Sequence, residues 1–107
     1  MSKYRNVKTV VDGITFDSKR EADRYCELKL LQRAGRITDL RLQVPFELQP
    51  AFTVNGKKVR PIHYIADFVY KENGQYIVED AKGHRTKEYM LKRKMYAYKY
   101  GREIKEV

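Results

Sequence analysis

The sequence is poor in cysteine, has no tryptophan and contains no long apolar run. Cys26 is the single cysteine of the chain, so it cannot form an internal disulfide, and without clustered cysteine and histidine there is no zinc framework. No stretch approaches the ~18–20 apolar residues of a membrane span, and the N-terminus does not resemble a signal peptide. We therefore expect a protein of the cytoplasm, in which any bound metal is held by carboxylates.

The length of 107 residues, of which 42% are hydrophobic, allows one domain with a single core over residues 1–107. Residues 1–6 are polar, and we expect them to be disordered. We therefore expect a single domain and not a two-domain enzyme.

The net charge is +9, and most of it lies in about one fifth of the chain. Between Lys82 and Arg102 there are eight basic residues and one acid, Glu88, which together give +7. Four tyrosines are interleaved with these charges: Tyr89, Tyr96, Tyr98 and Tyr100. This mixture is typical of a nucleic-acid contact, but a solvated basic helix face explains it equally well.

Turn and capping signals divide the first half of the chain into a hairpin, a helix and a strand. Residues 9–16 predict a short hairpin that turns at Asp12-Gly13. A Ser-x-x-Glu capping box at residues 18–21 opens a helix that runs to Ala34 and ends at Gly35. The alternation of Leu40, Leu42 and Val44 with polar residues predicts a strand, which Pro45 interrupts or bends.

The second half of the chain predicts antiparallel strands, a helix and a closing strand. Strands turn at Asn55-Gly56 and again around residues 72–74. A second helix over residues 87–100 ends at Gly101, and residues 102–107 form a strand with Ile104 inward. The fold class is therefore α/β, of the mixed-sheet type.

Two carboxylates and a lysine occupy strand positions where charge is costly. Asp67 stands in the middle of an apolar strand, where an unpaired carboxylate costs several kcal/mol, roughly, and so requires a cation or a metal. Strand alternation places Asp80 and Lys82 on one face and Glu79 on the other. Asp67, Asp80 and Lys82 can therefore form one cluster.

Glu21 lies on the first helix in a direction that differs from that of its polar neighbours. At 100° per residue it falls between Tyr25 and Leu28, away from the polar face. It either completes the capping box with Ser18 or faces the carboxylate cluster, and the two roles are compatible.

The same count on the second helix predicts which side is buried. The predicted buried residues are Met90, Leu91, Met95, Ala97 and Tyr98, with Lys94 among them. The opposite side carries Lys92, Arg93, Lys99, Tyr89, Tyr96 and Tyr100. Lys94 either extends its charged end outward or reaches a phosphate.

The residues described above resemble the PD-(D/E)XK nuclease superfamily, in particular small phage-encoded endonucleases similar to Holliday-junction resolvases and transposon end-cleaving endonucleases. The matching segments are residues 18–22, 64–68 and 78–83, which occur in the superfamily's order. The resemblance implies a restriction-endonuclease-like α-β-β-β-α-β core preceded by an N-terminal hairpin. It covers nearly the whole chain from residue 18 onward.

The resemblance also implies an activity, namely hydrolysis of DNA phosphodiester bonds by an endonuclease that requires Mg²⁺ or Mn²⁺. Asp67, Asp80 and the backbone carbonyl of Ala81 would hold the metal ion, Glu21 would complete the acidic cluster, and Lys82 would orient or activate the attacking water. Three positions depart from the pattern: Ala66 replaces Pro, Asp80 stands where Glu is often found, and Lys94 replaces the Gln of a Gln-x-x-x-Tyr element.

The expected partners are DNA and a second copy of the chain in a possible homodimer. The predicted DNA contacts are Lys92, Arg93, Lys94, Lys99 and Tyr96, and Gln43 is a further candidate for the carboxylate site. The resemblance points to a phage or prophage protein that acts in recombination, replication or packaging inside a bacterial cell. The alternative is a non-catalytic nucleic-acid-binding module with the same fold. A second, weaker alternative is an inhibitor or adaptor of a host enzyme.

Overall fold

The structure is a computed structural model that describes residues 7–81 and 84–107, so the predicted disorder of residues 1–6 lies outside the described residues. The elements in chain order are β1 (Thr9–Val11), β2 (Ile14–Phe16), α1 (Lys19–Arg33), β3 (Thr38–Gln49), β4 (Phe52–Val54), β5 (Lys57–Val59), β6 (Ile62–Glu72), β7 (Gln75–Asp80), α2 (Lys87–Tyr100) and β8 (Lys105–Glu106). The mixed α/β class and the order α-β-β-β-α-β, formed by α1, β3, β6, β7, α2 and β8, agree with the prediction.

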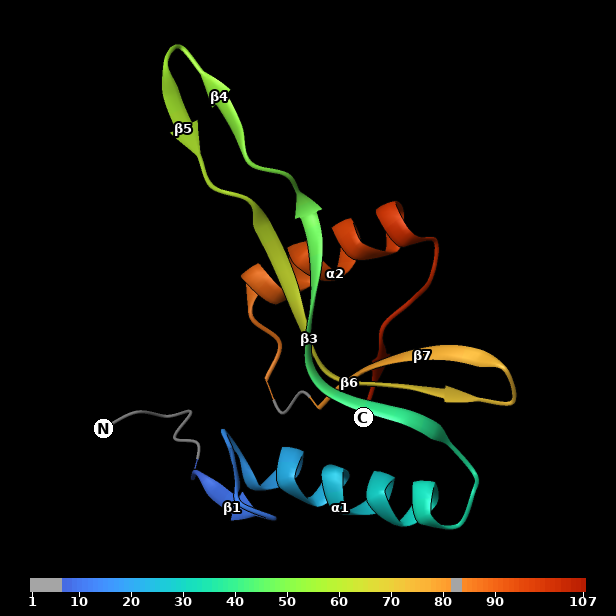
Figure 1. Cartoon of the computed structure of the whole chain (residues 1–107). Coiled ribbons are helices and arrows are strands. Elements are labelled where there is room, and N and C mark those ends of the chain that lie inside the picture. The colour runs from blue at the N-terminus through green and yellow to red at the C-terminus, as the bar shows by residue number, and fades with distance from the viewer. Residues whose placement is uncertain (1–6, 82–83) are drawn as a thin grey trace.

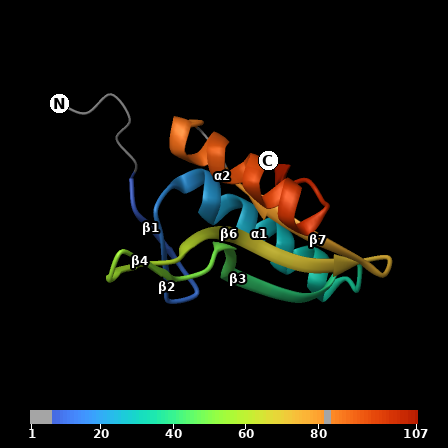
Figure 2. The same cartoon turned by 90° about the horizontal axis from the view of Figure 1, so that it is seen from above.

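The central sheet has the strand order β3-β6-β7-β8. β6 is antiparallel to both of its neighbours, β3 and β7, whereas β8 returns parallel to β7 after α2. The two helices lie on opposite sides of this sheet (Figure 1), and Figure 2 shows the same arrangement from above. No helix in the described part of the chain is long and apolar enough to cross a membrane.

Both helices begin and end where the local signals predict. The hydroxyl of Ser18 accepts a hydrogen bond from the Glu21 N–H at the start of α1, and Thr86 does the same for Tyr89 at the start of α2. Gly101 ends α2 with φ 68°, a left-handed conformation that glycine adopts without strain.

A sharp bend in β3 and β6 divides the molecule into two apolar cores. Leu42 packs in the core beneath α1, whereas Val44, two residues later, packs in the core beneath α2. Between them Gln43 has φ 53°, which is unusual for a non-glycine residue inside a strand. The bend is visible where β3 turns in Figure 1, and it changes which side of the sheet each half of the strand faces.

Of the two outcomes expected at Pro45, interruption or bending of the strand, β3 is not interrupted, and its bend lies two residues earlier at Gln43. The strand continues through Pro45, which pairs with Ile65 of β6. β3 lies at the edge of the sheet, where a proline without an N–H removes no hydrogen bond between strands.

The predicted buried side of α2 is wrong for Leu91 and Tyr98, whereas Met90 and Met95 are partly buried against the core as predicted. Leu91 and Tyr98 are 58% and 92% exposed, whereas Tyr89 and Tyr96 are 6% and 0% exposed. Tyr96 packs its ring against Phe46 and Tyr64. Tyrosine buries a large apolar ring in spite of its hydroxyl, so Tyr89 and Tyr96 are the fully buried residues of α2, with Met90 and Met95 at the margin of the same core.

Candidate carboxylate site

Asp67 and Asp80 lie side by side on neighbouring strands. Phe68 pairs with Glu79 in the β6–β7 register, so Asp67 and Asp80 adjoin one residue further along. The two carboxyl groups are close enough that Asp80 raises the pKa of Asp67. Oδ2 of Asp67 also accepts the backbone N–H of Ala81 at 2.9 Å. The cluster predicted for these two aspartates is therefore present.

Gln43 joins Glu21 to this pair. Its side-chain amide donates to Oε2 of Glu21 at 3.2 Å and to Oδ1 of Asp67 at 3.5 Å. Glu21 is 8% exposed on the inner side of α1, so it faces the cluster as expected, and its backbone N–H is capped by Ser18. The left-handed backbone of Gln43 lies at the bend of β3 and faces Asp67 across the strand pair. Backbone strain of this kind clusters at functional sites.

Tyr64 is a site residue that the sequence pattern did not indicate. Its hydroxyl donates to Oδ2 of Asp80 inside the core. Burial and the Asp80 carboxylate raise the pKa of Tyr64 well above its ordinary value, so the phenol stays protonated and remains a donor. Regular alternation would place Tyr64 and Asp67 on opposite faces. Ala66 and Val69, however, both pack beneath α2, so the alternation breaks between them.

Glu79 is excluded from the site, as strand alternation predicts. It is 0% exposed and forms two hydrogen bonds with Arg24, from Nε at 2.7 Å and from Nη2 at 2.8 Å, while Tyr70 donates to it as well. Because all these partners lie toward α1, Glu79 has a structural role as one half of a buried ion pair.

Asp67 carries the clearest electrostatic perturbation of the site. Burial, the hydrogen bond with Asp80, and the negative charges of Asp80 and Glu21 raise the pKa of Asp67 to about 8, although the N–H of Ala81 opposes the shift. Crowded carboxylates without a cation keep a proton at neutral pH.

The raised pKa predicts that the metal-free protein loses stability as pH rises from about 4 to about 8. In the unfolded chain the carboxyl group of Asp67 has its ordinary pKa of 3.8. Over this pH window the folded chain therefore holds a proton that the unfolded chain has released. Stability is highest below the unfolded pKa, falls by up to about 1.4 kcal/mol per pH unit, and levels off above the folded pKa.

Urea melts in chelator, from pH 4 to 9, of the wild type and of Asp67→Asn measure this effect. The wild type should lose stability relative to Asp67→Asn as pH rises. A stability difference that does not change with pH would contradict the assigned environment of Asp67.

The donor chemistry of the cluster fits a hard divalent cation. Among residues 7–81 and 84–107, no group of three His, Cys, Asp or Glu side chains is arranged to hold a metal ion as it stands. Asp67 and Asp80 nevertheless offer adjoining carboxylates, and Gln43 connects Glu21 to them. Oxygen donors are the ligands that Mg²⁺ and Mn²⁺ prefer, and a cation would relieve the repulsion that raises the pKa of Asp67. The predicted role of Lys82 lies outside the described residues.

The predicted DNA contacts on α2 need correction. Tyr96 is 0% exposed and cannot stack on a base. Lys99 donates to the backbone oxygen of Glu47, and Arg93 pairs with Glu106, so neither side chain is a purely solvated charge. Lys94 lies on the outer face of the helix and not on the inner one, because the tyrosines occupy the inner face. Lys92, with its side chain 30% exposed, pairs with Glu88.

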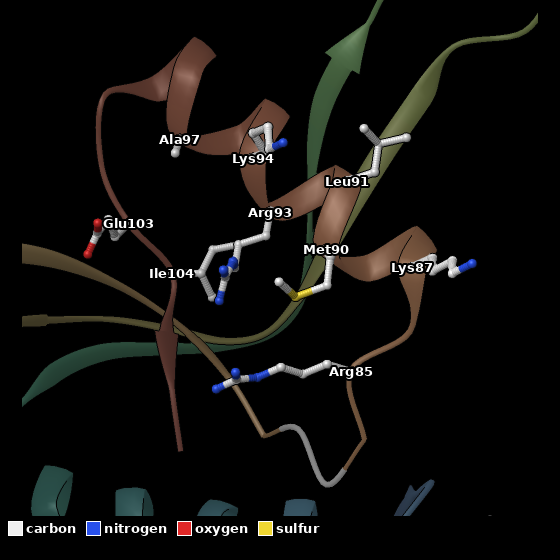
Figure 3. Close-up of a pocket in the computed structure, with 9 residues that line it drawn as sticks. All are labelled: Arg85, Lys87, Met90, Leu91, Arg93, Lys94, Ala97, Glu103 and Ile104. Carbon is white, nitrogen blue, oxygen red and sulfur yellow. The ribbon is translucent and has the colours of Figure 1, made fainter.

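A pocket of about 650 Å³ lies along the outer flank of α2, apart from the carboxylates. Figure 3 shows that Arg85, Met90 and Arg93 converge there, whereas Lys87 and Leu91 point the other way. Arg85 and Arg93 are both bound to Glu106, which offsets much of their charge. Since the carboxylates do not line this pocket, it is separate from the candidate site.

The fold and the site together define a mixed α/β protein with a buried carboxylate cluster where two central strands adjoin. Residues 1–107 match the family described as "Protein of unknown function (DUF1064)", and the chain belongs to this family. No curated protein and no solved structure matches the chain.

Proposed function

We propose that this protein is a metal-dependent endonuclease that hydrolyses DNA phosphodiester bonds. The observation that carries the proposal is the contact between Asp67 and Asp80, with Glu21 connected to them through Gln43. These are the acidic residues that the resemblance to PD-(D/E)XK nucleases selects, and they come from three different elements of an α-β-β-β-α-β core.

Each residue of the site has a distinct task under this proposal. Asp67 and Asp80, with the carbonyl of Ala81, hold Mg²⁺ or Mn²⁺, and Glu21 completes the acidic set. A divalent ion bound there would supply positive charge that favours deprotonation of water and offsets the negative charge of the phosphate. Tyr64 and Gln43 orient the carboxylates by hydrogen bonds. Lys82, which follows Ala81 directly, orients or activates the attacking water.

The same carboxylates argue against a module that only binds nucleic acid. Ionised carboxylates near a phosphate backbone repel it. Burial of these acids also costs folding free energy, and a protein that only binds nucleic acid gains nothing in return. The charge of +9 attracts DNA to the chain as a whole, whereas the cluster opposes it locally. A cation bound between the carboxylates and the phosphate would remove this local repulsion.

A panel of labelled duplex, flap, four-way and single-stranded DNA, each with Mg²⁺, Mn²⁺ or chelator, tests the proposal. We expect cleavage of at least one substrate with either ion and none with chelator. Binding without cleavage under all conditions would support the non-catalytic alternative. Failure to bind any nucleic acid would favour an inhibitor or adaptor.

Gln43→Leu should lower cleavage by about 10–100-fold and raise the Mg²⁺ concentration needed for half-maximal rate. Gln43 donates to Glu21 and Asp67 but is not itself expected to touch substrate, so it is a positioning residue. The matched control is Gln75→Leu at the exposed first position of β7, which should change neither value.

Metal titrations of the cleavage rate separate positioning from a general loss of folding. Unlike Gln43→Leu, the variant Gln43→Glu keeps a side-chain oxygen that can bind a metal ion, but it has no N–H to donate. It should therefore retain metal binding and lose the hydrogen bonds that orient Glu21 and Asp67. An unchanged Mg²⁺ requirement in Gln43→Leu would remove Gln43 from the site.

A further inference from the structure

A hairpin arm, residues 50–61 with β4 and β5, projects from the body of the molecule beyond the ends of β3 and β6 (Figure 1). Its two strands pair only with each other, in the register Phe52↔Val59, Thr53↔Lys58 and Val54↔Lys57, and no other described strand joins them. Every residue from 50 to 61 except Val59 is exposed. The arm therefore contributes almost nothing to either core.

The arm and its base contain no acidic residue. From residue 48 to residue 66 the sequence has no Asp or Glu, while Lys57, Lys58 and Arg60 carry three positive charges. This is the longest stretch of the chain without an acid, and it lies in space at the end of a projecting ribbon. Its charge is complementary to a polyanion.

The arm also exposes apolar side chains that nothing in the described chain covers. Phe52 and Val54 are 46% and 48% exposed. Residues opposite each other in an antiparallel pair share a face, so Lys57 lies on the same face as these two side chains. A two-stranded hairpin with strands of three residues is marginal by itself in water, so this ribbon gains most from an external partner.

We propose that the arm is a second DNA-binding surface that inserts as a β-ribbon into the major groove of duplex DNA near the carboxylate site. The inference rests on the proposed function for the choice of DNA as partner. The major groove admits a two-stranded ribbon. The phosphates along the groove are complementary to the positive charges of Lys57, Lys58 and Arg60. Thymine methyl groups in the groove offer apolar contacts for Phe52 and Val54. A second copy of the chain fits less well, because it would bring one acid-free arm against another.

The arm is connected to the carboxylates by β6 itself. From Ile62 at the base of the arm to Asp67 is five residues of strand, or about 17 Å. A hollow of about 280 Å³ lies between β6 and the start of α2, lined in part by His63, Tyr64 and Lys92. The hydroxyl of Tyr64 donates to Asp80, so one wall of this hollow adjoins the carboxylate site.

The test is the salt dependence of duplex binding, measured in chelator so that no cleavage occurs. The variant Lys57→Gln/Lys58→Gln/Arg60→Gln should bind a 30-base-pair duplex at least tenfold more weakly than wild type at 100 mM salt. The slope of log K against log salt should fall by about 2.7, since each lost phosphate contact removes about 0.9. The variant Phe52→Ser/Val54→Ser should weaken binding without changing the slope.

The matched control is Arg33→Gln/Arg36→Gln/Lys71→Gln, which removes the same charge from exposed positions at the other end of the sheet. It should leave the slope within about 1 of wild type. Equal slopes in the two triple variants, or no duplex binding by the wild type, would overturn the arm as a DNA contact. Sedimentation showing a wild-type dimer that the arm variant cannot form would assign the arm to a second copy instead.

Failure of this inference and failure of the proposed function are distinguishable. Arm-dependent duplex binding without cleavage in any metal would keep the arm and remove the nuclease activity. Metal-dependent cleavage by the arm variant, together with duplex affinity and a salt slope equal to those of wild type, would keep the nuclease activity and remove the arm as a DNA contact.

Discussion

Asp80→Asn is expected to abolish metal-dependent cleavage, with a loss of about 10³-fold or more, while DNA binding stays intact or becomes slightly tighter. The substitution removes a metal ligand, and that ligand contributes several kcal/mol of transition-state stabilisation in this class of chemistry. It also removes a negative charge that repels phosphate. Asparagine keeps an oxygen that can accept the Tyr64 hydroxyl, so the fold should be little affected.

Single-turnover cleavage and binding in chelator, measured on the best substrate of the panel, provide the two readouts. Glu103→Gln, an exposed acid outside the cluster, is the matched control and should cleave at the wild-type rate. Asp67→Asn should behave as Asp80→Asn does. Cleavage by Asp80→Asn at the wild-type rate would reject Asp80 as a ligand and with it the proposed site.

Arg24→Met is expected to destabilise the protein by about 3–5 kcal/mol, because it leaves the carboxylate of Glu79 buried without its ion-pair partner. Glu79 is 0% exposed, and Arg24 supplies two of its hydrogen bonds. At about 4–8 °C per kcal/mol for a chain of this size, the melting temperature should fall by more than 12 °C. Lys19→Met removes an exposed pair with Asp23 and should cost at most about 1 kcal/mol.

The double variant Arg24→Met/Glu79→Leu separates lost attraction from stranded charge. Replacing both partners by apolar residues removes the buried charge, so most of the stability lost in Arg24→Met should return. Denaturant melts at pH 7 measure all four proteins. A double variant as unstable as Arg24→Met would show that the ion pair itself, and not the uncompensated carboxylate, sets the cost.

The sequence by itself determined the elements whose signals are local. The Ser18–Glu21 cap, the glycines that end both helices, and the Asp-Gly and Asn-Gly turns all act within a few residues, so no knowledge of the tertiary structure was needed to place them. Strand alternation was also enough to put Glu79 and Asp80 on opposite faces, since alternation in β7 is unbroken.

Only the tertiary structure decided which side of α2 is buried. Met90, Leu91 and Ala97 form as regular an apolar stripe as Tyr89 and Tyr96 do, and a helix by itself does not distinguish them. Phe46 and Tyr64 on the sheet provide ring contacts for the tyrosines, so the sheet selects the aromatic side. Because the side of α2 that faces the sheet differs from the predicted one, the lysines predicted to contact DNA also face directions other than those predicted.

The assembly of the site likewise depended on residues far apart in the sequence. The alternation that sequence patterns assume breaks in β6 opposite the bend at Gln43, so Tyr64 and Asp67, which strand periodicity would place on opposite faces, both adjoin Asp80. A left-handed glutamine has no local sequence signature, because its strain is supported by Glu21 and Asp67 across the fold. Residue types and order thus follow from the sequence, whereas convergence of the carboxylates follows from the packing of α1 and β3 against β6 and β7.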